Sequence, residues 1–406
     1  MKKILFITDN FPPEVNAPAT RTYEHCKEWI RDKGTAVTVI TCVPNFPHGQ
    51  VYKGYKNKLY QKENIDGIEV IRVWSFITAN SGFFKRVIDY LSFAVVAFFF
   101  GLFQKCDVIV ATSPQFFTTW TAWTLSKIKR KPWVFELRDI WPESIKTVGA
   151  MKESYLITFL EKIELALYRD ATKVIAVTNS FRENLISRGI DSNKIDIITN
   201  GSNLDLFKHQ NKNEELLESL NLKDKFVIGY IGTHGMAHSL DFIVKSISKI
   251  DDQSIHFLFI GDGAVKKTIV QQAKRLNIQN ITFLNPVQKE DVAKYLSIID
   301  VSLAPLKKCD TFKTVIPSKI FEASAMQKPT LLGVEGEAQQ IIEKYNAGIC
   351  FEPENEVDFL EKINILKNDK ERYQSFQEGC IKLSLEFDRK NLANKMLKIL
   401  REVVEK

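Results

Sequence analysis

Short apolar runs alternate with amphipathic stretches along the whole chain. In the first half, the apolar runs of strand length are Ile4–Thr8, Ala36–Thr41, Ile68–Val73, Val108–Ala111, Trp133–Glu136, Val174–Val177 and Ile195–Ile198. In the second half they are Phe226–Ile231, His256–Ile260, Ile281–Phe283, Val301–Ala304, Thr330–Leu332 and Gly348–Phe351. Intervening segments such as Arg21–Asp32 and Tyr155–Tyr168 have helical periodicity. The alternation predicts an α/β protein with doubly wound, largely parallel sheets.

A polar break divides this alternation into two halves. The segment Lys208–Asp224 is rich in Asn, Lys and Glu, and 406 residues are enough for two cores. The sequence therefore predicts an N-terminal domain over 1–207 and a C-terminal domain over 208–387. A last helix is expected within Lys390–Val403.

Composition narrows the classes of function. Hydrophobic residues make up 45% and charged residues 26%, as in ordinary globular proteins. Six cysteines without paired spacing indicate reduced thiols in the cytoplasm, and no His/Cys cluster suggests a metal. The net charge is +7, but no basic run is long enough to suggest nucleic acid. The apolar start is too short for a signal peptide and ends at Asp9, so a first strand is expected.

The stretch Lys313–Thr330 carries the most specific chemistry. A helix is expected to begin at or just after Pro317-Ser318, leaving free N–H groups that attract anions. Lys319 would add a full charge in the first turn. Glu322 follows one turn later and could accept hydrogen bonds from a ribose diol. A cation for phosphate and a carboxylate for ribose predict a nucleotide-sugar site.

Glycine-containing loops follow two strands of the second half. After Phe226–Ile231 the chain reads Gly-Thr-His-Gly, and after His256–Ile260 it reads Gly-Asp-Gly. Glycines allow the backbone to approach phosphate closely, although a glycine pattern alone is weak evidence. The candidate donor-site residues in these loops are Gly232, Thr233, His234, Gly235, Gly261 and Gly263, with His238 a candidate catalytic group.

The Lys313–Thr330 stretch resembles the donor motif of family-four retaining glycosyltransferases with the GT-B fold. That motif is Glu, seven residues, Glu, and Glu322, Ala323, Ala325 and Pro329 match its second half. Thr314 occupies the position of the first Glu. The departure resembles N-acetylfucosamine and other amino-sugar transferases of bacterial O-antigen and capsule assembly. The resemblance implies two Rossmann-like domains facing a cleft, with a terminal helix, 388–406, crossing back to the first.

The resemblance also points to residues for acceptor and catalysis. Arg138-Asp139 resembles the family's His-Asp loop, in which the carboxylate orients the acceptor or stabilises the sugar's charge. The usual Arg and Lys of the glycine loop are replaced by Thr233 and His238. Four further candidates contact the acceptor in this view: Asn16, Ala17, Trp141 and Glu143.

The segment 83–103 has a basic, aromatic entry and then an almost wholly apolar run. Its uncharged part, about fourteen residues, is shorter than the ~20 residues of a transmembrane helix. It suits insertion into one leaflet's interface, and it suits a core helix equally well. The resemblance favours peripheral association with the cytoplasmic face of the inner membrane.

Together these features predict a metal-independent, retaining glycosyltransferase without cofactors. The resemblance implies a UDP-sugar donor, N-acetylated and specifically UDP-N-acetyl-L-fucosamine, and a polyprenyl-diphosphate-linked sugar acceptor. Two alternatives remain open at this point. A GT-B epimerase would turn over a UDP-sugar without acceptor, and a non-catalytic binder would show no turnover at all. The glycines lack dinucleotide spacing, which argues against a dehydrogenase.

Overall fold

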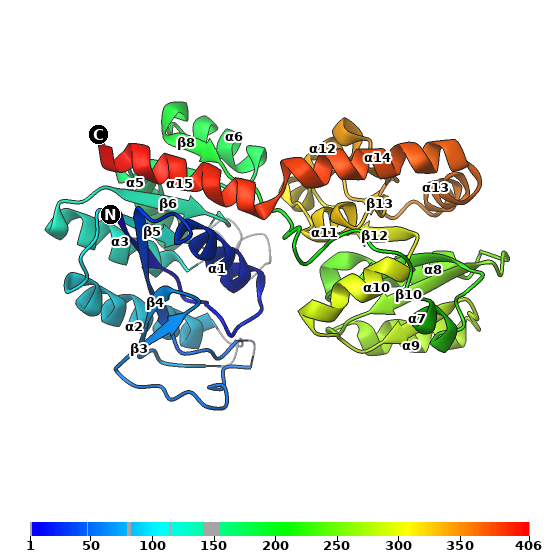
Figure 1. Ribbon diagram of the computed structural model, residues 1–406, viewed down its shortest axis with the longest axis horizontal. Coiled ribbons are helices and arrows are strands. Elements are labelled where there is room, and N and C mark those ends of the chain that lie inside the picture. The colour runs from blue at the N-terminus through cyan, green and yellow to red at the C-terminus, as the bar shows by residue number, and fades with distance from the viewer. Residues whose placement is uncertain (1, 47, 79–82, 114, 141–154, 406) are drawn as a thin grey trace. The chain divides into compact units, whose positions relative to one another are not determined.

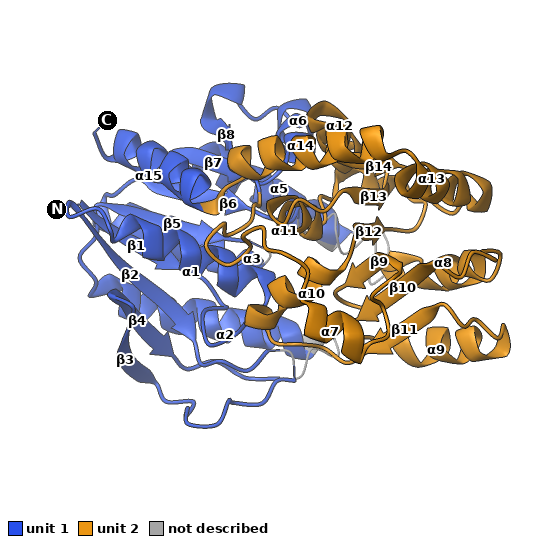
Figure 2. Ribbon diagram, turned by 45° about the vertical axis from the view of Figure 1, so that its right-hand side comes forward, with its two compact units in different colours: residues 1–199, 390–406 blue, residues 200–389 orange. Residues whose placement is uncertain are grey.

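The chain forms two compact units, one of which is discontinuous in sequence. The computed structural model describes residues 2–46, 48–78, 83–113, 115–140 and 155–405. Unit 1 comprises residues 1–199 and 390–406, and unit 2 comprises residues 200–389. Figure 2 colours the two units separately. The expected boundary at 207/208 lies a few residues beyond the first switch between them.

Unit 1 is built on a sheet whose strand order is β3-β4-β2-β1-β5-β6-β7-β8. Adjacent strands pair in parallel, except for the antiparallel β3–β4 hairpin. The strands are β1 Lys2–Ile7, β2 Thr35–Cys42, β3 Tyr60–Ile65, β4 Ile68–Val73, β5 Val108–Thr112, β6 Trp133–Leu137, β7 Lys173–Ala176 and β8 Ile195–Ile197.

Both faces of this sheet are covered, which is why its strands are apolar on both sides. On β1, Leu5 and Ile7 join one core cluster, while Ile4 and Phe6 join the other. Residues of α2, α3 and α5 complete the first cluster, and residues of α1 and α15 complete the second. The helices are α1 Ala17–Trp29, α2 Phe83–Leu102, α3 Phe116–Lys129, α5 Tyr155–Asp170, α6 Asn179–Ser187, α15 Arg389–Glu405 and the 3-10 turn η1 Ser192–Lys194.

The helix α15 returns the C-terminus to unit 1 (Figure 1). Its buried side chains, including Met396 and Leu400, pack with Val37, Val39 and other strand residues in the second core cluster. The indole Nε1 of Trp29 donates a hydrogen bond of 2.8 Å to the carbonyl oxygen of Ala393. This helix is therefore part of the core of unit 1.

The helix α2 is buried on one side only. Phe93 and Ala97 are fully buried against the sheet and α3, whereas Leu91, Val95 and Phe99 are exposed. The core interpretation thus holds for the buried face, and contact of the exposed face with a membrane remains a prediction. No helix in the described ranges combines the length and apolar character needed to cross a membrane.

Unit 2 contains a parallel sheet with strand order β11-β10-β9-β12-β13-β14. The strands are β9 Phe226–Ile231, β10 Ile255–Ile260, β11 Ile281–Leu284, β12 Val301–Pro305, β13 Thr330–Gly333 and β14 Gly348–Cys350. The helices are α7 Glu214–Ser219, α8 Leu240–Ile247, α9 Lys266–Arg275, α10 Val292–Ile298, α11 Lys319–Ala325, α12 Glu337–Tyr345, α13 Glu356–Asn368 and α14 Lys370–Glu386, with the 3-10 turns η2 Met236–His238, η3 Lys289–Asp291 and η4 Asp310–Thr314.

The predicted fold is confirmed in class and in nearly every strand. Each apolar run predicted as a strand forms one. The prediction missed β3, because its sequence, Tyr-Gln-Lys-Glu-Asn-Ile, is polar and its side chains are exposed or half-buried at the sheet edge. Edge strands need no continuous apolar run, so hydrophobicity does not reveal them.

Candidate active site

The loop after β9 is held in place by the loop after β10. The backbone N–H of His234 donates to the carbonyl oxygen of Asp262 at 2.8 Å, and Val265 N–H donates back to the His234 carbonyl at 3.0 Å. A Cβ on Gly261 would lie 1.9 Å from the carbonyl oxygen of Gly232. Backbone therefore meets backbone at the carboxyl end of the sheet. That contact explains why a glycine is needed at 261.

Gly263 has the same kind of constraint. A Cβ there would lie 2.5 Å from the carbonyl oxygen of His234, and its φ is +155°. Both glycines after β10 therefore serve the packing of the two loops. Loop packing by itself thus explains the two glycines. Their role in binding the donor remains a prediction.

Lys319, the first residue of α11, places its ammonium group against the glycine loop. The Nζ atom lies 3.7 Å from the centre of the Tyr230 ring and 3.4 Å from where a Cβ of Gly232 would stand. It is buried and has no hydrogen-bond partner within the described part of the chain. Burial lowers the pKa of Lys319 to about 7, although nearby Glu322 acts to raise it.

The two histidines of this loop are uncharged at neutral pH. Burial, with the neighbouring lysines, lowers the pKa of His234 to about 4, and burial with Lys319 does the same for His238. The ring of His234 is fully buried beside Tyr230, and His238 Nδ1 lies 3.4 Å from the Gly235 carbonyl oxygen. Neither histidine therefore supplies the charge of the missing Arg and Lys, whereas Lys319 places an ammonium group against the glycine loop.

The helix α11 begins at Lys319, directly after Pro317-Ser318, where the sequence predicted its start. Ser318 is the residue before the helix and makes no side-chain cap, so its hydroxyl is left exposed after Pro317. Glu322 is half-buried one turn into the helix, as expected. Thr314 ends η4, and its hydroxyl donates to the carbonyl oxygen of Thr311 at 3.1 Å. The residue at the position of the family's first Glu is thus bonded within its own turn.

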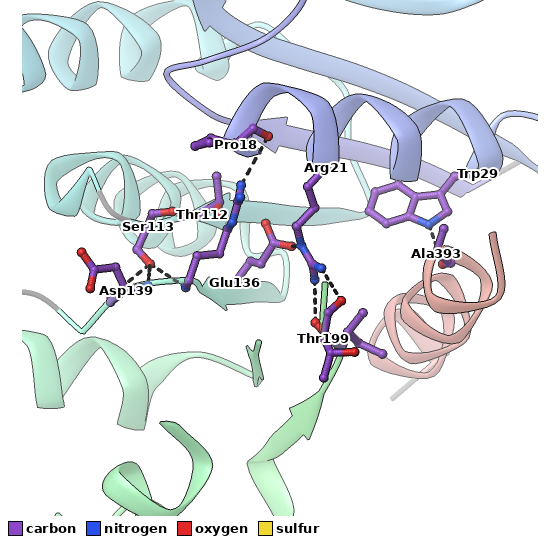
Figure 3. Close-up of polar contacts among 11 residues, drawn as sticks. Pro18, Arg21, Trp29, Thr112, Ser113, Glu136, Asp139, Thr199 and Ala393 are labelled. Carbon is purple, nitrogen blue, oxygen red and sulfur yellow. Dashed lines mark hydrogen bonds and ion pairs between the residues drawn. The ribbon is translucent and has the colours of Figure 1, made fainter. Parts of the chain in front are cut away.

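The loop after β6 is organised by one hydroxyl group (Figure 3). The Oγ of Ser113 accepts the backbone N–H groups of Arg138 and Asp139 at 2.8 and 3.1 Å, and donates to the Asp139 carbonyl at 3.2 Å. The guanidinium of Arg138 donates to the Pro18 carbonyl oxygen at 3.3 Å. These bonds fix where Asp139 stands at the end of the strand. Sequence reasoning did not identify Ser113.

A buried ion pair lies behind this loop. Arg21 Nε and Glu136 Oε1 are 2.9 Å apart, and the guanidinium also donates to the carbonyls of Ile198 and Thr199 (Figure 3). Burial would raise the pKa of Glu136, but the charges of Arg21 and Arg138 outweigh it and the pKa lies below its ordinary value. Arg21 thus joins α1 to β6 and to the end of β8.

Unit 1 contains a pocket, here called the acidic hollow, where β1 ends and α2 begins. It encloses about 190 Å³. Its lining residues are Asp9, Asn10, Asn16, Pro18, Asn45, Phe46, Thr78, Arg86, Asp89, Tyr90 and Gln115. Of this set, Asn16 was among the residues predicted individually to contact the acceptor. The spacing of Asp9 and Asp89 in sequence gave no signal that they share a cavity.

Of the four residues predicted to contact the acceptor, only Asn16 is among the residues that line the acidic hollow. Asn16 also caps α1, accepting the backbone N–H of Ala19 at 2.9 Å. Ala17 is exposed at the start of that helix and is not part of the hollow's lining. Trp141 and Glu143 lie outside the described residues.

Two family models match consecutive parts of the chain. The glycosyl transferase 4-like domain matches residues 17–201, and the model of glycosyl transferases group 1 matches residues 212–382. These ranges correspond closely to the contiguous part of unit 1 and to unit 2.

Curated relatives carry related descriptions. The putative colanic acid biosynthesis glycosyl transferase WcaI of Escherichia coli is 25% identical over 368 residues, covering 87% of this chain and 89% of the relative. The putative teichuronic acid biosynthesis glycosyltransferase TuaH of Bacillus subtilis is 22% identical over 250 residues, covering 61% and 62%.

Solved structures agree in fold. Sucrose-phosphate synthase from Thermosynechococcus elongatus superposes with a TM-score of 0.76 at 15% identity, covering 99% of both chains. Anabaena HepE in complex with UDP and glucose gives 0.70 at 16% identity, covering 99% of this chain and 100% of HepE. Identity at this level establishes the fold alone.

The fold and the two domain matches define the class: this protein is a glycosyltransferase with the GT-B fold. More particularly, it combines a glycosyl transferase 4-like domain with a glycosyl transferases group 1 domain, and is similar to the colanic acid and teichuronic acid glycosyltransferases named above. The prediction of a transferase is confirmed.

Proposed function

We propose that the protein transfers an N-acetylated sugar, N-acetyl-L-fucosamine, from its UDP derivative to a polyprenyl-diphosphate-linked sugar during assembly of a surface polysaccharide. The names of the Escherichia coli and Bacillus subtilis relatives support the polysaccharide role. The complex of Anabaena HepE with UDP and glucose supports a UDP-linked donor. The identity of the sugar is supported by the resemblance of the Lys313–Thr330 stretch to amino-sugar transferases.

The ammonium of Lys319 is the observation that carries the donor site, because it is buried and the described residues give it no hydrogen-bond acceptor. An ammonium group without a hydrogen-bond partner is costly to bury. A diphosphate placed beside the glycine loop would supply the missing acceptors and restore the full charge of the lysine. Glu322, on the same helix, has the position to hold a ribose diol.

In the proposed reaction, the bond between the sugar's C1 and the diphosphate oxygen breaks as the acceptor oxygen bonds to C1 from the same face. The acceptor's proton passes to the departing diphosphate, so that charge and atoms balance. Lys319 stabilises the charge that develops on the leaving group, which supports transfer without a divalent metal. Asp139, fixed by Ser113, orients the acceptor hydroxyl or stabilises the positive sugar.

An exposed apolar face on unit 1 supports a lipid-linked acceptor at the inner membrane surface. It includes the exposed side chains of Leu91, Val95 and Phe99 of α2 and of Trp123 of α3, which line one apolar groove. The face extends beyond the segment 83–103 expected from sequence. Exposed apolar surface on several helices is typical of interaction sites, including membrane interfaces.

The test is nucleotide-dependent stabilisation of the full chain. UDP at about a hundred times its dissociation constant should stabilise the wild type by about 2.7 kcal/mol. We expect Lys319→Met to bind UDP 10- to 100-fold more weakly, as lost charge-assisted hydrogen bonds would require. Glu322→Gln should weaken UDP and leave inorganic diphosphate binding unchanged. Lys344→Met, which removes a charge from α12, is the control.

Product analysis tests the remaining parts of the proposal. UDP-N-acetyl-L-fucosamine should be consumed in the presence of a lipid-linked sugar, with the anomeric configuration retained. Turnover without acceptor would indicate an epimerase. If Lys319→Met binds UDP as the wild type does, the donor site is assigned wrongly.

A further inference from the structure

Tyr230 contacts several parts of the candidate donor site, although the sequence patterns did not select it. It belongs to β9, and its side chain is fully buried. The centre of its ring lies 5.6 Å from that of His234, 6.1 Å from that of His238 and 5.5 Å from that of Phe259. One ring thus packs against both the loop after β9 and the neighbouring strand β10.

The hydroxyl group of Tyr230 fixes part of the loop after β9. It donates a hydrogen bond of 2.6 Å to the carbonyl oxygen of Thr233, whose side chain is exposed. A phenylalanine would fill the same core position, so the hydroxyl serves only its polar partner, and that partner is loop backbone. Thr233 lies between Gly232 and Gly235, where the backbone is least restricted. The hydroxyl therefore reduces the freedom of residues 232–235, the glycine loop.

The face of the same ring contacts the ammonium group of Lys319. The Nζ atom lies 3.7 Å from the ring centre, well inside the ~6 Å over which an aromatic face attracts a cation. Burial opposes the charged form of Lys319, whereas the carboxylate of Glu322 and the negative face of the ring favour it. The nearby His234 and His238 are uncharged at neutral pH. The ring therefore helps to keep this side chain charged and in place.

We propose that Tyr230 is a positioning residue of the donor site, whose ring holds the ammonium of Lys319 and whose hydroxyl holds the carbonyl of Thr233 before a diphosphate binds. The inference rests on the proposed function, whose donor site it deepens. A cation and a loop that are already in place lose less freedom when they bind a ligand. Tyr230 thus contributes to donor affinity through Lys319 and the glycine loop.

The first measurement follows the titration of Lys319 without any nucleotide. In the full chain labelled with ¹³C at the lysine Cε atoms, the Lys319 signal is the one that is missing from Lys319→Met. Tyr230→Phe keeps the ring, so the pKa of Lys319 should equal that in the wild type. Pentafluorophenylalanine at the same position keeps the ring's shape but reverses its charge distribution, so it should lower the pKa of Lys319 by about one unit. Equal pKa values in the two variants would overturn the role of the ring.

The second measurement compares the binding of UDP and of inorganic diphosphate to Tyr230→Phe and to a matched control. We expect Tyr230→Phe to bind both ligands about 3- to 10-fold more weakly, because the glycine loop loses its hydrogen bond. Tyr373→Phe removes a similar bond, of 2.9 Å, to the carbonyl oxygen of Asp300, which precedes β12 at the other end of the sheet. The control should lose comparable stability in denaturant unfolding and keep both affinities.

The outcomes separate this inference from the proposed function. If Tyr230→Phe binds both ligands as the wild type does, or if Tyr373→Phe weakens them equally, the hydroxyl does not position the loop, and the inference is wrong while the donor site stands. If neither UDP nor diphosphate binds to the wild type, the proposed function fails, and the inference fails with it whatever the ¹³C titration gives.

Discussion

Each unit buries ionisable groups, a basic one in unit 2 and acidic ones in unit 1, and in both places burial favours the uncharged form. In unit 2 the group is the ammonium of Lys319, beside two neutral histidines. In unit 1 it is the carboxyl pair of Asp9 and Asp89. In both places the ligand-free protein bears a cost that a complementary ligand removes.

The difference between the two places concerns the kind of ligand each can accept. A buried cation with free donors selects an anion, whereas two proton-holding carboxyls select a neutral group with hydroxyls. A transferase must bind one nucleotide-linked sugar and one acceptor without exchanging them. Under the proposed function, the ammonium of Lys319 would attract the donor's diphosphate in unit 2.

The largest expected effect is that of Gly261→Ala, which disrupts the contact between the loops after β9 and β10 in unit 2. The added methyl would lie 1.9 Å from the Gly232 carbonyl oxygen, at a φ of +146°. We expect a loss of about 3–5 kcal/mol in the free energy of unfolding, from overpacking plus backbone strain. Gly54→Ala, where φ is +93° but no atom lies within 4 Å, should cost about 1 kcal/mol. Denaturant unfolding measures both, and equal losses would contradict the loop contact.

Lys319→Met should make the ligand-free protein more stable in a pH-dependent way. The folded pKa of about 7 lies below the unfolded value near 10.4, so between them the unfolded chain binds more protons. The cost of the lysine is therefore complete below pH 7 and disappears by about pH 10.5. We expect the variant to be more stable by roughly 2–4 kcal/mol at pH 6.5, with the gap closing on the alkaline side. A constant gap would mean that the ammonium is not desolvated.

Asp89→Asn should show the opposite pH trend. The folded pKa of about 7 lies above the unfolded value near 3.9, so the folded protein holds the proton more tightly. The cost of the carboxyl is absent below pH 4 and complete above pH 7. We expect the variant to be more stable by the order of 2 kcal/mol at pH 8 and equal to the wild type at pH 4. Thermal melts across pH, with Glu183→Gln as control, measure the gap.

The smallest expected effect concerns the packing of α15. Trp29→Phe removes the hydrogen bond to the Ala393 carbonyl and part of a buried ring. We expect a loss of about 1–2 kcal/mol, confined to unit 1. Stabilisation by UDP, which involves unit 2, should be unchanged. Tyr60→Phe, on the edge strand β3, is a matched exposed control.

Sequence patterns predicted those features that are local along the chain. The strands are visible because parallel strands buried on both faces need continuous apolar runs. Lys319 and Glu322 were predicted as donor-site residues because both stand on one short helix with a recognisable start. Both kinds of signal come from residues near one another in sequence.

The features that sequence patterns missed depend on contacts between distant segments. Asp9 follows β1 and Asp89 belongs to α2, and only the folded sheet places them on one hollow. Ser113, which fixes the backbone of Asp139, belongs to a different loop. His234 and His238 are uncharged because they are buried, and the sequence does not show how deeply a histidine is buried.

The return of α15 to unit 1 has a consequence for how the protein is made. Domains generally fold during synthesis from the N-terminus onward. Here one face of the first sheet is completed by side chains such as Met396 and Leu400, which are translated after the whole of unit 2. Unit 2, within residues 200–389, is complete before them. The second core cluster of the unit that is translated first therefore stays incomplete until α15 has been synthesised.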